Sequence, residues 1–326
     1  MFSEGLHSVS QGLALLSNLD GLPKPMAELA VQPINGSSLT FNELREASDD
    51  NGRALLTQVY DPHSGSFLTA HPAGTTELKD DAFSTSLRLR LGLDQIPAGY
   101  KCTTHNVEFD CEGRHALSCQ NFQGAVHTRH DLIRDELFST CVVLDRNCET
   151  SYHFSYEGDP NDAEADLPRL EQHATGRSIP GDIALRLQRD SGVRTFYDIT
   201  VINSLTDTAI STINENANLE EGLQKVLNGA FNKKVLKHGA DVSKAGGRFV
   251  PLVVSVTGVW HQESLRELHK LAEFAATRQG KSETEAWKLL LARLGCSLAK
   301  GNECVLKSTR NALQTESASD MTVLRT

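Results

Sequence analysis

Residues 180–202, PGDIALRLQRDSGVRTFYDITVI, carry the clearest structural pattern in the chain. Large apolar side chains occupy every second position from Ile183 to Leu187, as in a strand with one buried face. The run Thr195–Ile202 is rich in β-branched and aromatic residues, which favour strands. Between them, Arg189–Gly192 has the composition of a turn. The pattern therefore predicts a β-hairpin.

The hairpin places two acidic residues opposite each other. With the turn centred near Asp190, Asp182 is expected to face Asp198, within one residue of register. Directly opposed side chains in a hairpin lie about 5 Å apart, and two carboxylates at that distance repel each other unless a cation lies between them. We therefore predict a Mg²⁺ (or Mn²⁺) site that could activate water against a phosphodiester. The alternative is a pair of exposed aspartates at the strand ends.

A helix predicted over Asn218–His238, closed by Gly239, carries two lysines on an unexpected side. Its apolar residues, from Leu219 to Ala230, form one stripe at helical spacing, and Lys234 and Lys237 continue that stripe. A lysine on the core-facing side of a helix is costly unless its ammonium group has a partner. The aspartate pair would supply one, and such a lysine could stabilise a phosphate transition state. The alternative is that both side chains extend to solvent at the helix end.

An acidic residue from elsewhere could complete the metal site. A helix is predicted from Asp131, as N-cap, to Val143, and Glu136 lies on its apolar side. Glu171 is the other candidate, because it lies closer to Asp182 in the sequence.

A separate group of cysteines and histidines has the spacing of a zinc site. The pattern is Cys102-x2-His105-x9-His115-x3-Cys119. Four such ligands in short, paired spacings suit tetrahedral Zn²⁺. Cys111 lies in the intervening loop and could replace His105. The alternative is a set of buried thiols and loop histidines that bind no metal.

The chain is acidic overall but has a basic segment. Its formal net charge is −10, which argues against general coating of nucleic acid. Residues 225–248, however, contain six Lys or Arg and one acid. Such a segment can form a phosphate-binding face, although a solvated helix face is the alternative. The residues predicted to contact nucleic acid are Arg129, His130, Lys233 and His238.

The sequence also predicts where the protein resides. It contains no run of about 18 apolar residues, so no membrane span is expected. Residues 1–19 lack the basic start and apolar block of a secretory signal. A nuclear or cytoplasmic protein that is not secreted is therefore expected.

The remaining pattern predicts an α/β fold in which helices cover a small mixed sheet. The further elements are a helix over 80–93, a strand over 249–256 and two C-terminal helices, the second opening with a capping box of Ser282 and Glu285.

Fragments spread over about residues 66 to 260 resemble, in order and spacing, the C-terminal part of reverse-transcriptase polyproteins from non-LTR retrotransposons. The fragments are Ser66–Pro72 (SFLTAHP), Phe83, Leu87–Gly92 (LRLRLG), Cys102, Gly113, His115–Cys119 (HALSC), Arg129–Asp131 (RHD), Pro180–Ile183 (PGDI), Asp198–Val201 (DITV), Lys234-x2-Lys237-His238 and Phe249-x-Pro251-Leu252.

The resemblance implies a zinc knuckle that positions the protein on nucleic acid, followed by a restriction-endonuclease-like core that nicks target DNA. By position, Asp182 and Asp198 would be metal ligands, and Lys234 or Lys237 would be a relocated catalytic lysine. The chain departs from the family pattern at Ile179, at His238 and at His105, where an arginine, an aromatic residue and a cysteine are expected.

These observations predict four regions: a partly helical N-terminal region (1–97), a zinc-knuckle-like segment (98–126), the nuclease core (127–260) and C-terminal helices (261–326). The expected function is metal-dependent nicking of DNA, with RNA as a second candidate partner. No polymerase signature in a strand setting is present, so any reverse transcriptase is expected to be separate or lost. The alternatives are a catalytically inactive, zinc-containing nucleic-acid-binding module and a decayed retroelement remnant.

Overall fold

A computed structural model describes residues 41–145, 148–150, 181–186 and 193–323 of the 326-residue chain. The elements, in chain order, are α3 (Phe41–Ala47), α4 (Asp50–Tyr60), η1 (Ser66–Thr69), η2 (Gly74–Thr76), α5 (Asp80–Arg90), η3 (Ala116–Ser118), η4 (Gln120–Phe122), α6 (Gln123–Leu144), β1 (Glu149–Thr150), β2 (Ile183–Arg186), β3 (Arg194–Ile202), α8 (Asp207–Asn214), α9 (Leu219–Lys234), the π-helical turn η5 (Val235–Gly239), α10 (Ala240–Lys244), β4 (Arg248–Ser255), α11 (Gln262–Gln279) and α12 (Glu283–Val323).

The strands form one mixed sheet in the order β1-β2-β3-β4. β1, β2 and β3 pair antiparallel, and β3 pairs parallel with β4. In the β2–β3 ladder Ile183 is opposite Tyr197 and Arg186 is opposite Arg194. This register is the one predicted for the hairpin, and one more step along it places Asp182 opposite Asp198. The residues between the two strands, including Asp190, lie outside the described residues.

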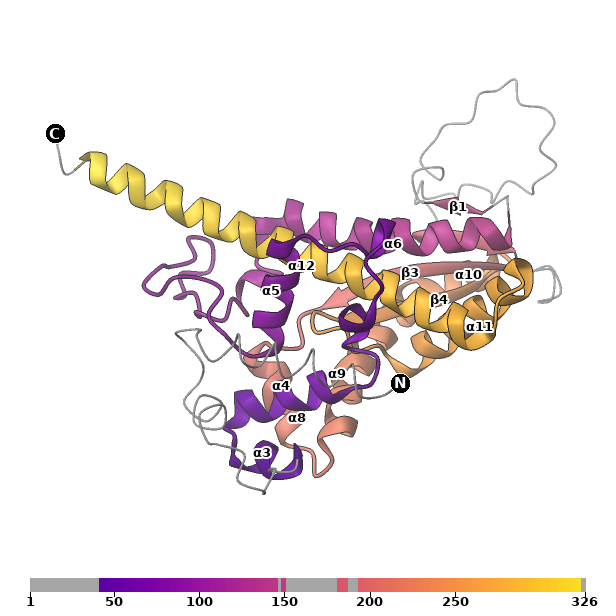
Figure 1. The fold of residues 1–326 in the computed structure, drawn as a ribbon, viewed down its shortest axis with the longest axis horizontal. Coiled ribbons are helices and arrows are strands. Elements are labelled where there is room, and N and C mark those ends of the chain that lie inside the picture. Colours follow the sequence, from indigo (N-terminus) through magenta and orange to yellow (C-terminus); the bar gives the residue numbers. More distant parts are fainter. Residues whose placement is uncertain (1–40, 146–147, 151–180, 187–192, 324–326) are drawn as a thin grey trace.

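Helices cover both faces of the sheet (Figure 1). On one face, buried side chains of β2, β3 and β4 pack against α6, α11 and α12. α12 runs alongside α6 and also contacts α5, η1 and η3. On the other face, Phe196 packs with Val242 of α10, while Val253 packs with α8 and α9. The general prediction of an α/β fold with a small, helix-covered sheet is confirmed.

Two helix boundaries differ from the prediction. α6 begins at Gln123, so Asp131 lies within the helix, where its carboxylate accepts a hydrogen bond from Arg134 (2.8 Å). Gly239 does not end α9, because its φ of −61° is helical and η5 continues directly into α10. Asparagine and aspartate favour caps, and glycine favours helix ends, only as tendencies that packing can override. The capping box at Ser282 and Glu285 is confirmed by reciprocal hydrogen bonds.

Within the part of the chain that the structure describes, no helix combines the length and the apolar character needed to cross a bilayer.

The position of α9 depends on a close approach to α8. A Cβ atom on Gly222 would lie 2.6 Å from the carbonyl oxygen of Ile213, whereas a Cβ atom on Gly229 would meet nothing within 4 Å. Only glycine at position 222 allows the two helices to approach this closely. The contact sets the path of α9, which carries Lys234 at its end.

We therefore expect opposite effects of the same substitution at these two positions. Gly222→Ala should lower the free energy of unfolding by about 1–3 kcal/mol, because the added methyl group clashes with backbone. Gly229→Ala should raise it by up to about 1 kcal/mol, since alanine is the better helix former at an open position. Urea unfolding of both variants would test this. Equal effects of the two substitutions would contradict the role given to Gly222.

Candidate functional site

Asp182 is held against β3 by its backbone and by its side chain. Its N–H donates to the carbonyl oxygen of Tyr197 (2.7 Å), and its Oδ2 accepts a hydrogen bond from the N–H of Ile199 (2.6 Å). These contacts lie on either side of Asp198 in β3. The two aspartates are therefore neighbours on the sheet, as the hairpin register requires.

Asp198 is buried, with 7% of its surface exposed, and has a lysine partner. Its Oδ2 lies 2.8 Å from Nζ of Lys234 at the end of α9. Burial raises the pKa of Asp198, and the nearby charge of Asp182 adds to the increase, although Lys234 opposes it. The prediction that Lys234 reaches the aspartate pair is confirmed.

Lys237 lies on a different side of the helix. The π-helical turn η5 begins at Val235, directly after Lys234. A π-helix has more residues per turn than an α-helix, so the 100° projection used for the sequence does not hold beyond Lys234. Lys237 is exposed instead of continuing the buried stripe. His238 is partly buried, with its ring 5.6 Å from that of Phe249, and burial lowers its pKa.

His130 belongs to the aspartate site. It lies on α6, with its Nε2 3.0 Å from Oδ2 of Asp182 and its Nδ1 3.1 Å from Asp131. Burial disfavours the charged imidazolium, but the hydrogen bonds and charges of Asp182 and Asp131 outweigh this effect and raise the pKa of His130. The histidine expected to contact nucleic acid thus contacts one of the aspartates.

Two other predicted site residues contact α12 instead. Arg129 is 2% exposed and donates a hydrogen bond to Oδ1 of Asn302 (3.1 Å), so its expected role in nucleic-acid binding is wrong for this arrangement. Glu136 is buried and forms an ion pair with Arg293. Because Glu136 is paired with Arg293, its carboxylate does not complete the aspartate site as expected. The other candidate, Glu171, lies outside the described residues.

Sequence reasoning missed Thr200. It lies two residues after Asp198 in β3, so both side chains are on the same face of the strand. Its hydroxyl oxygen is buried and has no hydrogen-bond partner among the described residues. The alternation of side chains along the predicted strand was the signal that could have identified it.

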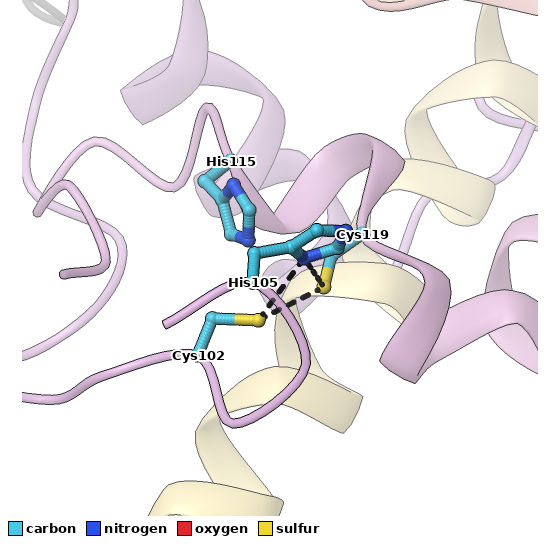
Figure 2. A group of neighbouring side chains, drawn as sticks. All are labelled: Cys102, His105, His115 and Cys119. Atoms are coloured by element: carbon cyan, nitrogen blue, oxygen red, sulfur yellow. Dashed lines mark hydrogen bonds between the residues drawn. The ribbon is translucent and has the colours of Figure 1, made fainter. Parts of the chain in front are cut away.

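The four predicted zinc ligands lie together (Figure 2). One ligand atom from each of Cys102, His105, His115 and Cys119 can be chosen so that all four lie within 4.8 Å of one another. Sγ of Cys102 is 3.3 Å from Nδ1 of His105 and 3.5 Å from Sγ of Cys119. Tetrahedral zinc, with bonds of about 2.0–2.3 Å, requires ligand atoms at roughly such separations. Among the described residues, this is the one group of three or more His, Cys, Asp or Glu that could hold a metal ion.

Short loops build this Cys/His cluster. Cys102 and His105 lie in a tight turn in which Cys102 N–H donates to the carbonyl oxygen of Val107 (2.8 Å). The turn is completed by Asn106, which has a positive φ of 53°. The other pair is fixed by Asp110, whose carboxylate accepts a hydrogen bond from the N–H of His115 (2.7 Å). The loops thus orient both pairs toward a common centre.

The donor set suits a metal in its chemistry as well. Nε2 of His115 is buried without a hydrogen-bond partner among the described residues. In the metal-free protein, burial raises the pKa of Cys119 to about 11. Metal binding would displace the thiol proton and give the buried imidazole nitrogen a partner. Cys111 is outside the group, so His105, and not Cys111, lies with the other three residues.

Comparison with protein-family models finds no matching family, and comparison with curated protein sequences finds no match.

We expect Cys119→Ser to lose bound zinc, because three ligands hold the ion far more weakly than four. The loss should also lower the melting temperature, since the bound ion would cross-link the two ligand pairs in the folded state. Zinc content per chain, measured by mass spectrometry, and thermal unfolding would test this. Cys111→Ser is the matched control and should keep its zinc. Equal zinc content in Cys119→Ser and wild type would contradict the site.

Asp198→Asn should stabilise the protein at neutral pH. The pKa of Asp198 is raised in the folded state, so its ionised form opposes folding. Below pH 3.8, the ordinary pKa of an aspartate, Asp198 is protonated in both the folded and the unfolded chain and does not oppose folding. As the pH rises through the higher pKa of the folded state, the carboxylate ionises and the folded protein loses stability. The variant should therefore have a higher melting temperature than wild type at pH 7, and the difference should shrink as pH falls toward 3.8. A variant that melts below wild type at pH 7 would contradict this.

Proposed function

We propose that this chain is a metal-dependent DNA endonuclease with a restriction-endonuclease-like core and a zinc-binding segment, of the kind found in retrotransposon proteins. The observation that carries the proposal is the contact between Lys234 and Asp198, with Asp182 held beside them on the sheet. Two neighbouring carboxylates and a partly buried ammonium group are the residue types that hydrolysis of a phosphodiester requires. The small mixed sheet flanked by helices is compatible with such a core.

The residues fit a hard divalent cation. Asp182 and Asp198 would hold Mg²⁺ or Mn²⁺ through carboxylate oxygens, the ligands that these ions prefer. When bound, the ion would polarise the phosphodiester and lower the pKa of a water molecule. Burial is the main cause of the raised pKa of Asp198, and a cation beside the two carboxylates would offset the smaller contribution from the charge of Asp182.

The chain's own residues would orient the site and balance its charge. Lys234 would stabilise the negative charge that develops on the phosphate oxygens during in-line attack. His130 would donate a hydrogen bond from Nε2 to Asp182 and so fix the direction of that carboxylate.

The Cys/His cluster would hold Zn²⁺ and place the nucleic acid on the protein. The substrate would be DNA, with RNA as a second candidate, and the protein would act in the nucleus. It would work with a reverse transcriptase.

A second candidate is a zinc-containing nucleic-acid-binding module without catalysis. It is favoured by the engagement of Glu136 with Arg293, which leaves the aspartate pair without a third acidic ligand among the described residues. Decay of a former nuclease would produce the same arrangement.

Nicking of supercoiled plasmid separates the two candidates. We expect zinc-loaded protein to nick DNA when Mg²⁺ or Mn²⁺ is added, and not when both are omitted. Omission is preferable to a chelator, because a chelator would also strip the Cys/His cluster. Asp198→Asn and Lys234→Met should each reduce the rate by at least about 100-fold.

Lys288→Met is the matched control, because Lys288 is an exposed lysine of α12. It should nick at the wild-type rate. Thermal unfolding of Asp198→Asn would show that the variant is folded, so that a loss of nicking could be assigned to the site. Wild-type rates in both site variants would contradict the nuclease assignment. DNA binding without metal-dependent nicking would favour the binding module.

A further inference from the structure

The outer side of the turn between α9 and α10 combines a highly exposed leucine with lysines. Leu236 is 84% exposed, the largest value among the large apolar side chains that the structure describes. Lys233 and Lys237, on either side of it in sequence, are exposed, as is Lys244 at the end of α10. None of the three lysines has an ion-pair partner among the described residues. We call these four residues the Leu236 surface.

Leu236 is exposed in the folded chain, so a ligand that covered it would remove an apolar side chain from water. The π-helical turn that carries Leu236 is itself uncommon, and such turns are frequent at functional sites. The charge is also unusual, since three exposed lysines gather on a chain whose net charge is −10.

The surface lies close to the aspartate site. Lys234 points inward to Asp198, while Leu236, two residues later, points outward from the same stretch of helix. Lys233, which belongs to the Leu236 surface, is the chain neighbour of Lys234, so the surface begins at the end of the helix that reaches the aspartate site.

We propose that the Leu236 surface binds the substrate nucleic acid beside the aspartate site. Lys233, Lys237 and Lys244 contact phosphates, and Leu236 contacts sugars or base edges in a groove. The positive charge selects a polyanion, and an exposed aliphatic side chain flanked by lysines is the type that enters DNA grooves. This inference deepens the proposed function and rests on it for the identity of the ligand.

Salt-dependent binding to a short DNA duplex, measured by fluorescence anisotropy in the presence of Ca²⁺ to prevent cleavage, tests the two parts separately. The double variant Lys233→Ala, Lys237→Ala should reduce the slope of log affinity against log salt by about 2, because two phosphate contacts are lost. Leu236→Ala should weaken binding about tenfold at every salt concentration and leave the slope unchanged.

Leu289→Ala, at an apolar position of α12 that is 40% exposed, is the matched control and should bind as wild type does. Unchanged affinity in all Leu236-surface variants would overturn the inference, and so would a change only in self-association, measured by sedimentation. The plasmid assay keeps the two proposals distinct. If wild type nicks DNA and the variants bind it normally, only the role of the Leu236 surface is contradicted. If the variants bind DNA more weakly but wild type does not nick it, only the endonuclease function is contradicted.

Discussion

Antiparallel pairing of β2 with β3 is the constraint on which the candidate site depends. The pairing fixes Asp182 between the carbonyl oxygen of Tyr197 and the N–H of Ile199, and so sets it beside Asp198. Two neighbouring carboxylates, one of them buried, oppose folding. His130 and Lys234 reduce that cost from opposite sides of the sheet, since α6 packs on one face and α9 on the other. The placement of α6 and α9 on opposite faces of the sheet therefore gives each aspartate its own partner, His130 for Asp182 and Lys234 for Asp198.

Local patterns in the sequence predicted the parts of the structure that depend on near neighbours. The hairpin register follows from alternation and turn position, and the Cys/His cluster follows from spacing within a short segment. The inward direction of Lys234 follows from helical periodicity. In each case the deciding contacts lie on one element or on two elements whose pairing the sequence makes evident.

The errors came from long-range packing and from one change of helix type. Arg129 and Glu136 look available in sequence, but their partners, Asn302 and Arg293, lie more than 150 residues away on a helix whose position no local pattern indicates. Lys237 was misplaced because a π-helical turn has no clear sequence signature.

The long helix α12 connects the two sites through the folded protein. It contacts α6, whose His130 reaches the aspartates, and it packs with Leu117 and Cys119 through Leu306. A Cβ atom on Gly113, between the two ligand pairs, would lie 2.6 Å from Leu306, so the loop and the helix are in tight contact. The Cys/His cluster is thus fastened to the body of the protein instead of being tethered by a linker. If both sites bind one nucleic acid, the folded protein would fix the distance between the segment bound at the Cys/His cluster and the segment bound at the aspartate pair.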